Sequence, residues 1–286
     1  MMVVQTALVL LAFAANSLLC RWALREYSFD SESFTIIRLV AGAVVLSVLL
    51  WYQNIRLGSR NRVCPNSRRF WLLGLGLFVY ASAFSMAYVS LDTGVGAFVL
   101  FATVQLGLQW VNIWRGARPG AWQLVGMLVS ITGLALLLLP GSALSSWWAV
   151  LLMVTAALGW TGFVVLGQGS STPLADVQAA FVAASLLSIL LIPFTAEPEW
   201  SNWQPLLLAV ISGAIASGLG YFGWYRVLPW LGIHRAAQVQ LLVPGLAVLM
   251  GALVLSERLT TLMLLAMGLI VAGVLIAIRA RRSVDT

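Results

Sequence analysis

The chain has 286 residues, of which 61% are hydrophobic and only 9% are charged. Soluble domains carry about 25% charged residues, so this composition excludes a soluble globular protein and predicts one that lies in a lipid bilayer. The net charge of +7 arises because sixteen arginines outnumber nine acidic residues. The arginines form small groups at the ends of apolar segments rather than one basic face, so we expect no nucleic-acid partner.

Apolar segments of the length that a bilayer requires follow one another along the whole chain. A membrane-spanning helix needs about 20 mostly apolar residues. We therefore predict an all-α integral membrane protein of ten transmembrane helices joined by short connections. The predicted helices cover residues 3–20, 34–52, 70–90, 94–113, 122–140, 147–167, 174–194, 205–228, 236–255 and 261–279.

The connections between these segments differ in their arginine content. With a cytoplasmic N-terminus, twelve arginines fall on the cytoplasmic side, whereas only Arg21, Arg25 and Arg258 fall outside. Arginine is concentrated in the cytoplasmic loops of membrane proteins. We therefore predict a multi-pass protein of the cell inner (plasma) membrane with both termini in the cytoplasm.

The two halves of the chain share a weak repeat. A shift of 140 residues places Gly133 on Gly273 and aligns several leucines and alanines in the same register. We predict a first five-helix repeat over residues 1–140 and a second over residues 141–286. Because five is odd, the second repeat must be inverted in the membrane. Inverted repeats are typical of transporters, whose substrate site lies between the halves near the midplane.

Short motifs in both halves follow a family pattern. The first half contributes Asn16, Phe34, Arg38 and Ala41, and the second half contributes residues 221–228 (YFGWYRVL), 242–245 (LVPG), 255–259 (LSERL) and 268–273 (GLIVAG). These residues resemble the EamA-type family of the drug/metabolite transporter superfamily. The resemblance implies a small-molecule transporter, since relatives export amino acids, other metabolites and drugs. Val104 and Ala117 stand where the first half of the family pattern has proline and glutamate.

Polar and aromatic side chains at midplane depth are the candidate substrate-binding residues. Gln105 and Gln109 share one helical face, and burying an unpaired amide costs about 1–3 kcal/mol. We expect both at a cavity wall, with bridging between helices as the alternative. On the ninth predicted helix, Gln238 shares a face with Gly245, whereas Gln240 points away. The full candidate set is Asn16, Tyr80, Gln105, Gln109, Trp160, Tyr221 and Gln238.

Pro244 and Gly245 lie in the middle of the ninth predicted helix. Proline removes one helical hydrogen bond, and non-helical backbone at membrane depth is tolerated where it lines a cavity. We expect a helix kink at this pair, formed either at the binding site or as a packing bend.

Charged residues are almost absent from the predicted helices. Arg38 lies about one turn inside the second predicted helix. A charged side chain at the centre of a membrane helix would cost about 2.5–3.5 kcal/mol. We expect its side chain to reach the interface or to pair with acidic loops, with an anion-attracting role as the alternative. No carboxylate lies at mid-membrane depth, so we expect that transport does not depend on an intramembrane carboxylate. If transport is coupled to protons, Asp176 and Glu257 at helix ends are the nearest candidates.

We therefore expect a membrane transporter that exports a small metabolite by alternating access. The tyrosine, tryptophan and amide residues favour an amphipathic or aromatic solute, of which amino acids are one instance. The sequence shows no nucleophile beside a base and no metal-ligand cluster, so we expect neither catalysis nor a cofactor. A membrane-embedded enzyme, a channel and a non-transporting membrane subunit remain the alternatives, and a homo-oligomer is compatible with the sequence.

Overall fold

The protein is described from a computed structural model. The described residues are 2–58, 67–116, 118, 120–136, 146–168, 170–196, 203–240, 242–258 and 260–282, without the side chains of 57, 134, 229, 232–238 and 278–282.

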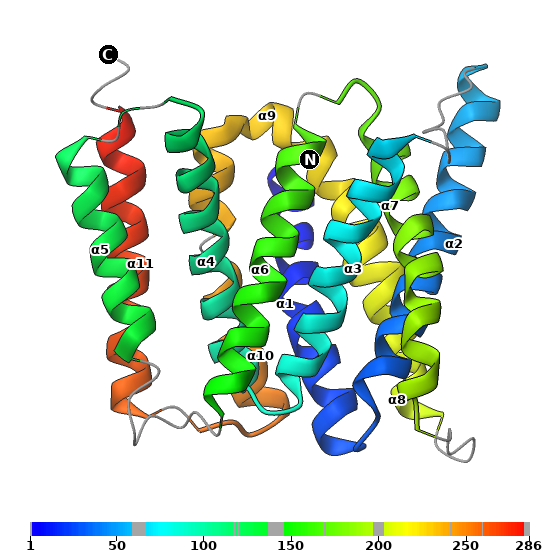
Figure 1. Ribbon diagram of the computed structural model, residues 1–286, viewed down its shortest axis with the longest axis horizontal. Helices are drawn as coiled ribbons and strands as arrows, with labels where there is room; N and C mark the ends of the chain where they lie inside the picture. The colour runs from blue at the N-terminus through cyan, green and yellow to red at the C-terminus, as the bar shows by residue number, and fades with distance from the viewer. Residues whose placement is uncertain are drawn as a thin grey trace.

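Helices account for all the regular structure in these ranges (Figure 1). The first five are α1 (Met2–Glu26), α2 (Ser31–Leu57), α3 (Arg68–Tyr88), α4 (Thr93–Trp114) and α5 (Ala121–Leu136). The remaining ones are α6 (Trp147–Gly167), α7 (Pro173–Leu187), η1 (Ser188–Phe194), α8 (Gln204–Ile211), η2 (Ser212–Leu219), α9 (Gly220–Gln240), α10 (Leu242–Val254) and α11 (Thr261–Arg282).

The predicted all-α membrane architecture is confirmed, and the predicted number of spans is met in part. Within the described ranges, seven helical segments are long and apolar enough to cross a bilayer. Three further apolar stretches are shorter, at Ala121–Gly133, Leu242–Val254 and Thr261–Ala277.

Polar residues in the connections set several helix ends. The side chain of Asp30 accepts the backbone N–H of Ser33 at 2.7 Å and so caps α2, while Ser67 and Ser146 cap α3 and α6 in the same way. Side-chain oxygens at this position satisfy N–H groups that have no helical partner. Gly58 ends α2 with a φ of +60°, a conformation that glycine adopts without a steric penalty.

The region of the eighth and ninth predicted helices is divided differently from the prediction. The chain is helical from Gln204 to Gln240 through α8, η2 and α9, and η2 is a π-helix. The next helix, α10, begins at Leu242. The connection predicted at 229–235 is therefore helical, whereas residues 236–240 lie in α9, residues 242–254 lie in α10, and residue 241 lies outside the described residues.

The helices pack in a pattern that recurs in the two halves of the chain. In the first half α3 packs on α6 and α7, and in the second half α8 packs on α1 and α2. Likewise α4 packs on α6, while α10 packs on α1. The start of α1 and the end of α11 lie on one side, the top of Figure 1. We call this side the terminal face and the other side the opposite face.

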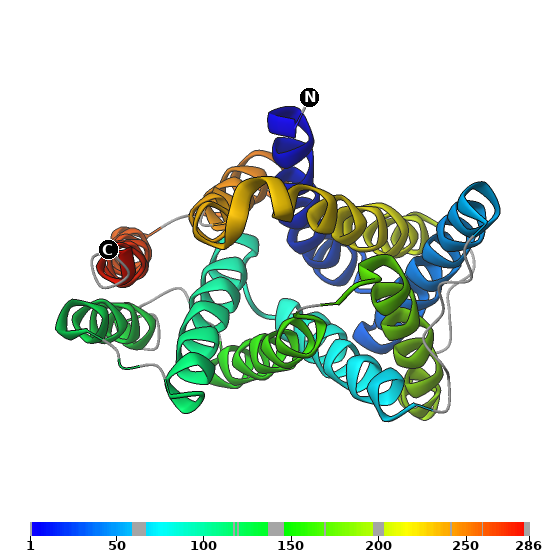
Figure 2. The same cartoon turned by 90° about the horizontal axis from the view of Figure 1, so that it is seen from above.

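The α5–α11 pair stands at one edge of the molecule (Figure 2). Two close approaches hold it: a Cβ atom on Gly126 would lie 2.5 Å from the carbonyl oxygen of Gly273, and one on Gly133 would lie 2.8 Å from the carbonyl oxygen of Ala266. Small residues allow such backbone contact between membrane helices. The contacts show that α5 and α11 run antiparallel, because the earlier residue of one helix meets the later residue of the other.

Candidate functional site

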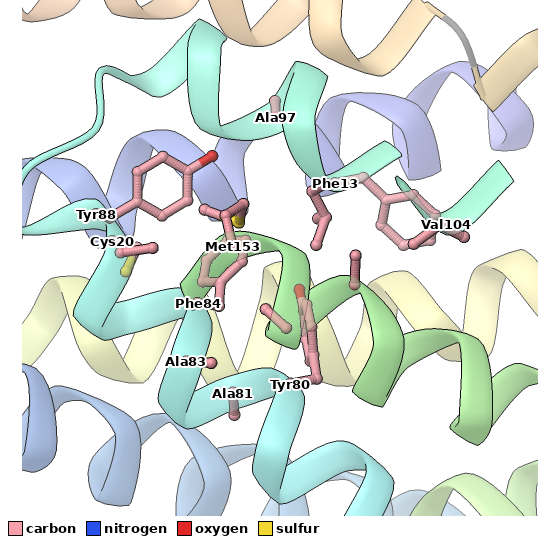
Figure 3. Close-up of a cluster of buried hydrophobic side chains, with 14 of the residues drawn as sticks. Phe13, Cys20, Tyr80, Ala81, Ala83, Phe84, Tyr88, Ala97, Val104 and Met153 are labelled. Carbon is pink, nitrogen blue, oxygen red and sulfur yellow. The ribbon is translucent and has the colours of Figure 1, made fainter. Parts of the chain in front are cut away.

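A cavity lies between helices from both halves of the chain. Within it, the centre of a water molecule can move through about 30 Å³, room for a water molecule or two but not for a metabolite. Figure 3 shows Phe13, Tyr80, Phe84 and Val104, four of the residues that line it. The lining residues are Phe13, Asn16, Ser17, Tyr80, Phe84, Leu100, Phe101, Val104, Trp160, Tyr221 and Gln240.

Four aromatic rings from four different helices meet at this cavity. The ring centroid of Trp160 lies 5.1 Å from that of Tyr80 and 4.8 Å from that of Tyr221. Phe13 contacts Tyr221 edge-on at 5.8 Å. Aromatic pairs favour such separations. The cluster therefore packs α1, α3, α6 and α9 together and forms an apolar wall of the cavity.

Asn16 supplies the central polar contact of the cavity. Its side-chain oxygen accepts hydrogen bonds from the hydroxyls of Ser212 at 2.7 Å and Ser217 at 3.3 Å, and its Nδ2 donates to the hydroxyl of Tyr80 at 3.4 Å. Ser212 and Ser217 belong to η2, where i→i+5 hydrogen bonding brings residues five apart onto one face. In an α-helix they would point about 140° apart. The π-helical stretch therefore lets both hydroxyls reach one amide.

Four of the predicted site residues come together at this cavity, namely Asn16, Tyr80, Trp160 and Tyr221. Gln105 and Gln109 of α4 are not among its lining residues. Gln105 is buried, and the Oε1 of Gln109 is buried without a hydrogen-bond partner. The side chain of Gln238 lies outside the described residues.

Sequence reasoning passed over Gln240, which lines the cavity. The sequence pattern excluded Gln240 because a regular helix places it about 200° from Gln238, on the face away from Gly245. Gln240 belongs to α9 and Gly245 to α10, and residue 241 between them lies outside the described residues. The available signal was the residue type, since an amide at membrane depth needs a polar partner and favours a cavity wall.

Pro244 and Gly245 lie in α10, which is described from Leu242 to Val254. Residue 241 lies outside the described residues, so the helix kink expected at this pair stays a prediction. Gly245 has open space where a Cβ atom would stand.

Arg38 departs most from the expectation for a charged side chain in a membrane helix. It is only 1% exposed, and its Nε and Nη1 atoms have no hydrogen-bond partner. Its guanidinium carbon lies 5.2 Å from the ring centroid of Tyr80 and 4.9 Å from that of Phe84. Desolvated cation–π contacts contribute about 2 kcal/mol each. Within the described residues, the side chain therefore neither reaches the interface nor pairs with an acidic loop. Both expectations from the sequence are corrected by this packing.

A charged cluster closes the opposite face. The carboxylate of Glu257 accepts hydrogen bonds from the backbone N–H and the hydroxyl of Thr93, all at 2.9 Å. Arg21 bridges Asp92 at 3.0 Å and lies 3.6 Å from Glu257, while it also donates to the carbonyl of Tyr88 at 2.9 Å. These contacts tie the end of α1, the start of α4 and the connection after α10 together.

Burial raises the pKa of Glu257 above its ordinary value of 4.5. The hydrogen bonds from Thr93 act against this change, the charge of Asp92 adds to it, and the charge of Arg21 opposes it. The ionised carboxylate is therefore held in place at a desolvation cost.

A third ion pair lies at the terminal face. The Nη2 of Arg69, at the start of α3, contacts the carboxylate of Asp176 in the first turn of α7 at 2.6 Å, and its Nε donates at 3.4 Å. The Asp176 side chain is buried, whereas Arg69 is partly exposed. Each face of the molecule is thus held by its own ion pairs.

Comparison with known proteins identifies the family. Residues 147–279 match the model of the EamA-like transporter family. An uncharacterized protein of Pseudomonas aeruginosa is 44% identical over 255 residues, which cover 89% of this chain and 86% of that protein. An uncharacterized transporter of Archaeoglobus fulgidus is 25% identical over 230 residues, which cover 79% of this chain and 83% of that protein.

A solved structure, described only as "Crystal structure of protein", shares the fold with a TM-score of 0.63. It is 20% identical in sequence, and the match covers 97% of this chain and 99% of the other. Together with the apolar spans and the motifs of the second half, these findings establish that the chain is a multi-pass membrane protein whose residues 147–279 belong to the EamA-like transporter family.

Proposed function

We propose that the protein exports a small amphipathic or aromatic metabolite by alternating access, with the cavity around Asn16 and Tyr221 as its substrate site. One observation carries this proposal. The cavity lies between helices α1, α3 and α4 of the first half and α6 and α9 of the second, where an inverted-repeat transporter places its substrate. Its aromatic rings suit an apolar body, and its amide and hydroxyl groups suit a polar end.

The recurring packing supports an inverted repeat over residues 1–140 and 141–286. A shift of 140 residues carries Gly126 to Ala266 and Gly133 to Gly273. The same shift exchanges the two helices, so that the contact between Gly126 and Gly273 corresponds to the contact between Ala266 and Gly133. Both contacts are present in the α5–α11 seam, the close contact between these two helices. A two-fold axis in the membrane plane produces this exchange, and two such repeats rocking about it would open the site to either side in turn.

The two faces supply the contacts that such rocking must break. Arg21, Asp92 and Glu257 hold the opposite face, and Arg69 and Asp176 hold the terminal face. Because the cavity is too small for a metabolite, the structure corresponds to a closed state. Opening toward one side would release one of these clusters while the other stays intact.

The arginine distribution supports an orientation with the terminal face in the cytoplasm. Arg56, Arg68 and Arg115 stand at helix ends on that face, in agreement with the concentration of arginine on the cytoplasmic side of membrane proteins. In this orientation the Arg21 cluster faces the outside of the inner membrane, and export requires it to open.

A comparison of metabolites in matched bacterial strains tests the proposed function. One strain lacks the protein, one overproduces it, and one overproduces the Tyr221→Ala variant. We expect at least one small metabolite to accumulate inside the deletion strain and to rise in the medium of the overproducing strain. The variant strain should resemble the deletion strain. Identical metabolite profiles in all three strains, with the protein present in the membrane, would contradict an exporter.

A further inference from the structure

Arg38 is a buried cation that forms no ion pair with any of the described residues. It is 1% exposed, and two of its three guanidinium nitrogens have no hydrogen-bond partner. The acidic residues of the ion pairs in the described structure are engaged elsewhere, Asp92 and Glu257 with Arg21 and Asp176 with Arg69. The closed state therefore leaves N–H donors and a positive charge that an additional anion would satisfy.

The guanidinium group adjoins the cavity. It stacks on Tyr80 and Phe84 at 5.2 and 4.9 Å, and both rings line the cavity. The backbone of Arg38 is fixed from the other side, because Gly213 of η2 packs directly against its carbonyl group. Since the cavity must widen to admit a substrate, the rings that separate it from Arg38 are the ones that have to move.

The charges around the cavity define what this cation would accept. Among the described residues that line the cavity, none carries a carboxylate, and the polar groups are amides, hydroxyls and the indole N–H of Trp160. One guanidinium balances one negative charge, and its parallel N–H groups match the two oxygens of a carboxylate. A dianion would leave a net charge in an apolar site.

We propose that Arg38 binds the carboxylate of a monoanionic substrate whose apolar or aromatic body lies against Tyr80, Trp160 and Tyr221. This inference rests on the proposed transport function, whose substrate class it specifies. The anion-attracting role that the sequence left open for Arg38 thereby acquires a defined ligand and a defined place.

Thermal unfolding of the purified protein in detergent tests the proposal through matched probes. The probes are carboxylates and their carboxamides: phenylacetate with phenylacetamide, indole-3-acetate with indole-3-acetamide, and hexanoate with hexanamide. We expect at least one carboxylate to raise Tm by about 3–5 °C at roughly ten times its Kd, while its amide leaves Tm unchanged. Stabilisation by both members of every pair, or by none of the six probes, would overturn the proposal.

Variants of α2 complete the test. Arg38→Gln should abolish the shift caused by the carboxylate, and Arg38→Lys should retain part of it. Arg56→Gln is the matched control, because Arg56 lies on the same helix over Tyr52 at 5.1 Å but is exposed; it should respond like the unmodified protein. A full shift in Arg38→Gln would overturn the proposal. If that variant does not fold, the difference between carboxylates and amides in the unmodified protein decides it.

The binding assay tests the role of Arg38 and the metabolite comparison tests the exporter, so each proposal can be contradicted without the other. An exported metabolite together with no preference for carboxylates would leave the exporter standing and remove the role of Arg38. A preference for carboxylates that Arg38→Gln abolishes, together with identical metabolite profiles, would remove the exporter and keep the anion site.

Discussion

The carboxylate of Glu257 holds the backbone N–H of Thr93 at 2.9 Å, so a connection in the second half of the chain binds the first turn of a helix in the first half. Glu257 also covers Gly251, where a Cβ atom would meet its carboxylate. Asp92 and Glu257 lie in two separate connections between the predicted helices, far apart in the sequence. The structure brings them together around Arg21.

Stability should depend on pH through Glu257. Burial raises the pKa of this carboxyl group above 4.5, so the folded state binds the proton more tightly than the unfolded chain does. The stability that this group contributes therefore falls as the pH rises from about 4.5 through the raised pKa. In Glu257→Gln, Tm should decline less over this range than in the unmodified protein, as measured by thermal unfolding at several pH values.

The exposed Glu26 lies on the same face and provides a control. Glu26→Gln should keep the pH dependence of the unmodified protein. Equal slopes of Tm against pH in all three proteins would contradict the buried environment of Glu257.

The α5–α11 seam should not tolerate a methyl group at Gly273. A Cβ atom there would lie 2.5 Å from both the carbonyl oxygen of Gly126 and the backbone nitrogen of Ser130, and backbone atoms cannot move aside cheaply. Gly273→Ala should destabilise the protein by about 1–3 kcal/mol. Gly268→Ala on the same helix meets open space and should leave stability unchanged or raise it, since alanine favours helix. Equal Tm values for the two variants would show that the seam is not this close.

Asn16 and Ser212 should be energetically coupled. The 2.7 Å hydrogen bond between them is buried, and removal of one partner leaves the other unsatisfied at a cost of about 1–3 kcal/mol. We expect Asn16→Ala and Ser212→Ala each to lower the free energy of unfolding, and the double variant to lose less than the sum of the two. A double-mutant cycle measures this difference. Strictly additive losses would mean that the hydrogen bond contributes nothing.

The C-terminus should lie in the cytoplasm. We expect a reporter that is active only in the cytoplasm to work when fused after Thr286, and a reporter that is active only outside to fail there. A fusion within the connection between α10 and α11 should give the reverse result. An externally active reporter at the C-terminus would invert the orientation proposed from the arginine bias.

The sequence predicted the apolar membrane helices and four of the eleven residues that line the cavity, because both depend on local rules. Apolar length placed the spans, and the depth of Tyr80, Trp160 and Tyr221 along their helices brought them to one level. It could not predict the contacts that depend on helix irregularities. The π-helical stretch that aligns Ser212 with Ser217 changes the phase between residues that regular helix geometry assumes constant.

Arg38 shows the same limit for charge. Helix position placed it one turn from the interface, from which a long side chain can reach water. The rings of Tyr80 and Phe84 instead hold it inside. Such packing between distant segments has no signature in a single helix.

Efflux from proteoliposomes containing only the purified protein tests the central claim most directly. The vesicles are loaded with the metabolite that accumulates in the deletion strain, and its release is compared with release from vesicles without protein. We expect release to saturate with substrate concentration in the unmodified protein, and to weaken in Tyr221→Ala. It should persist in Trp203→Ala, whose side chain is 60% exposed at the start of α8. Release equal to that of empty vesicles, or release unaffected by Tyr221→Ala, would contradict a transporter with its site at this cavity.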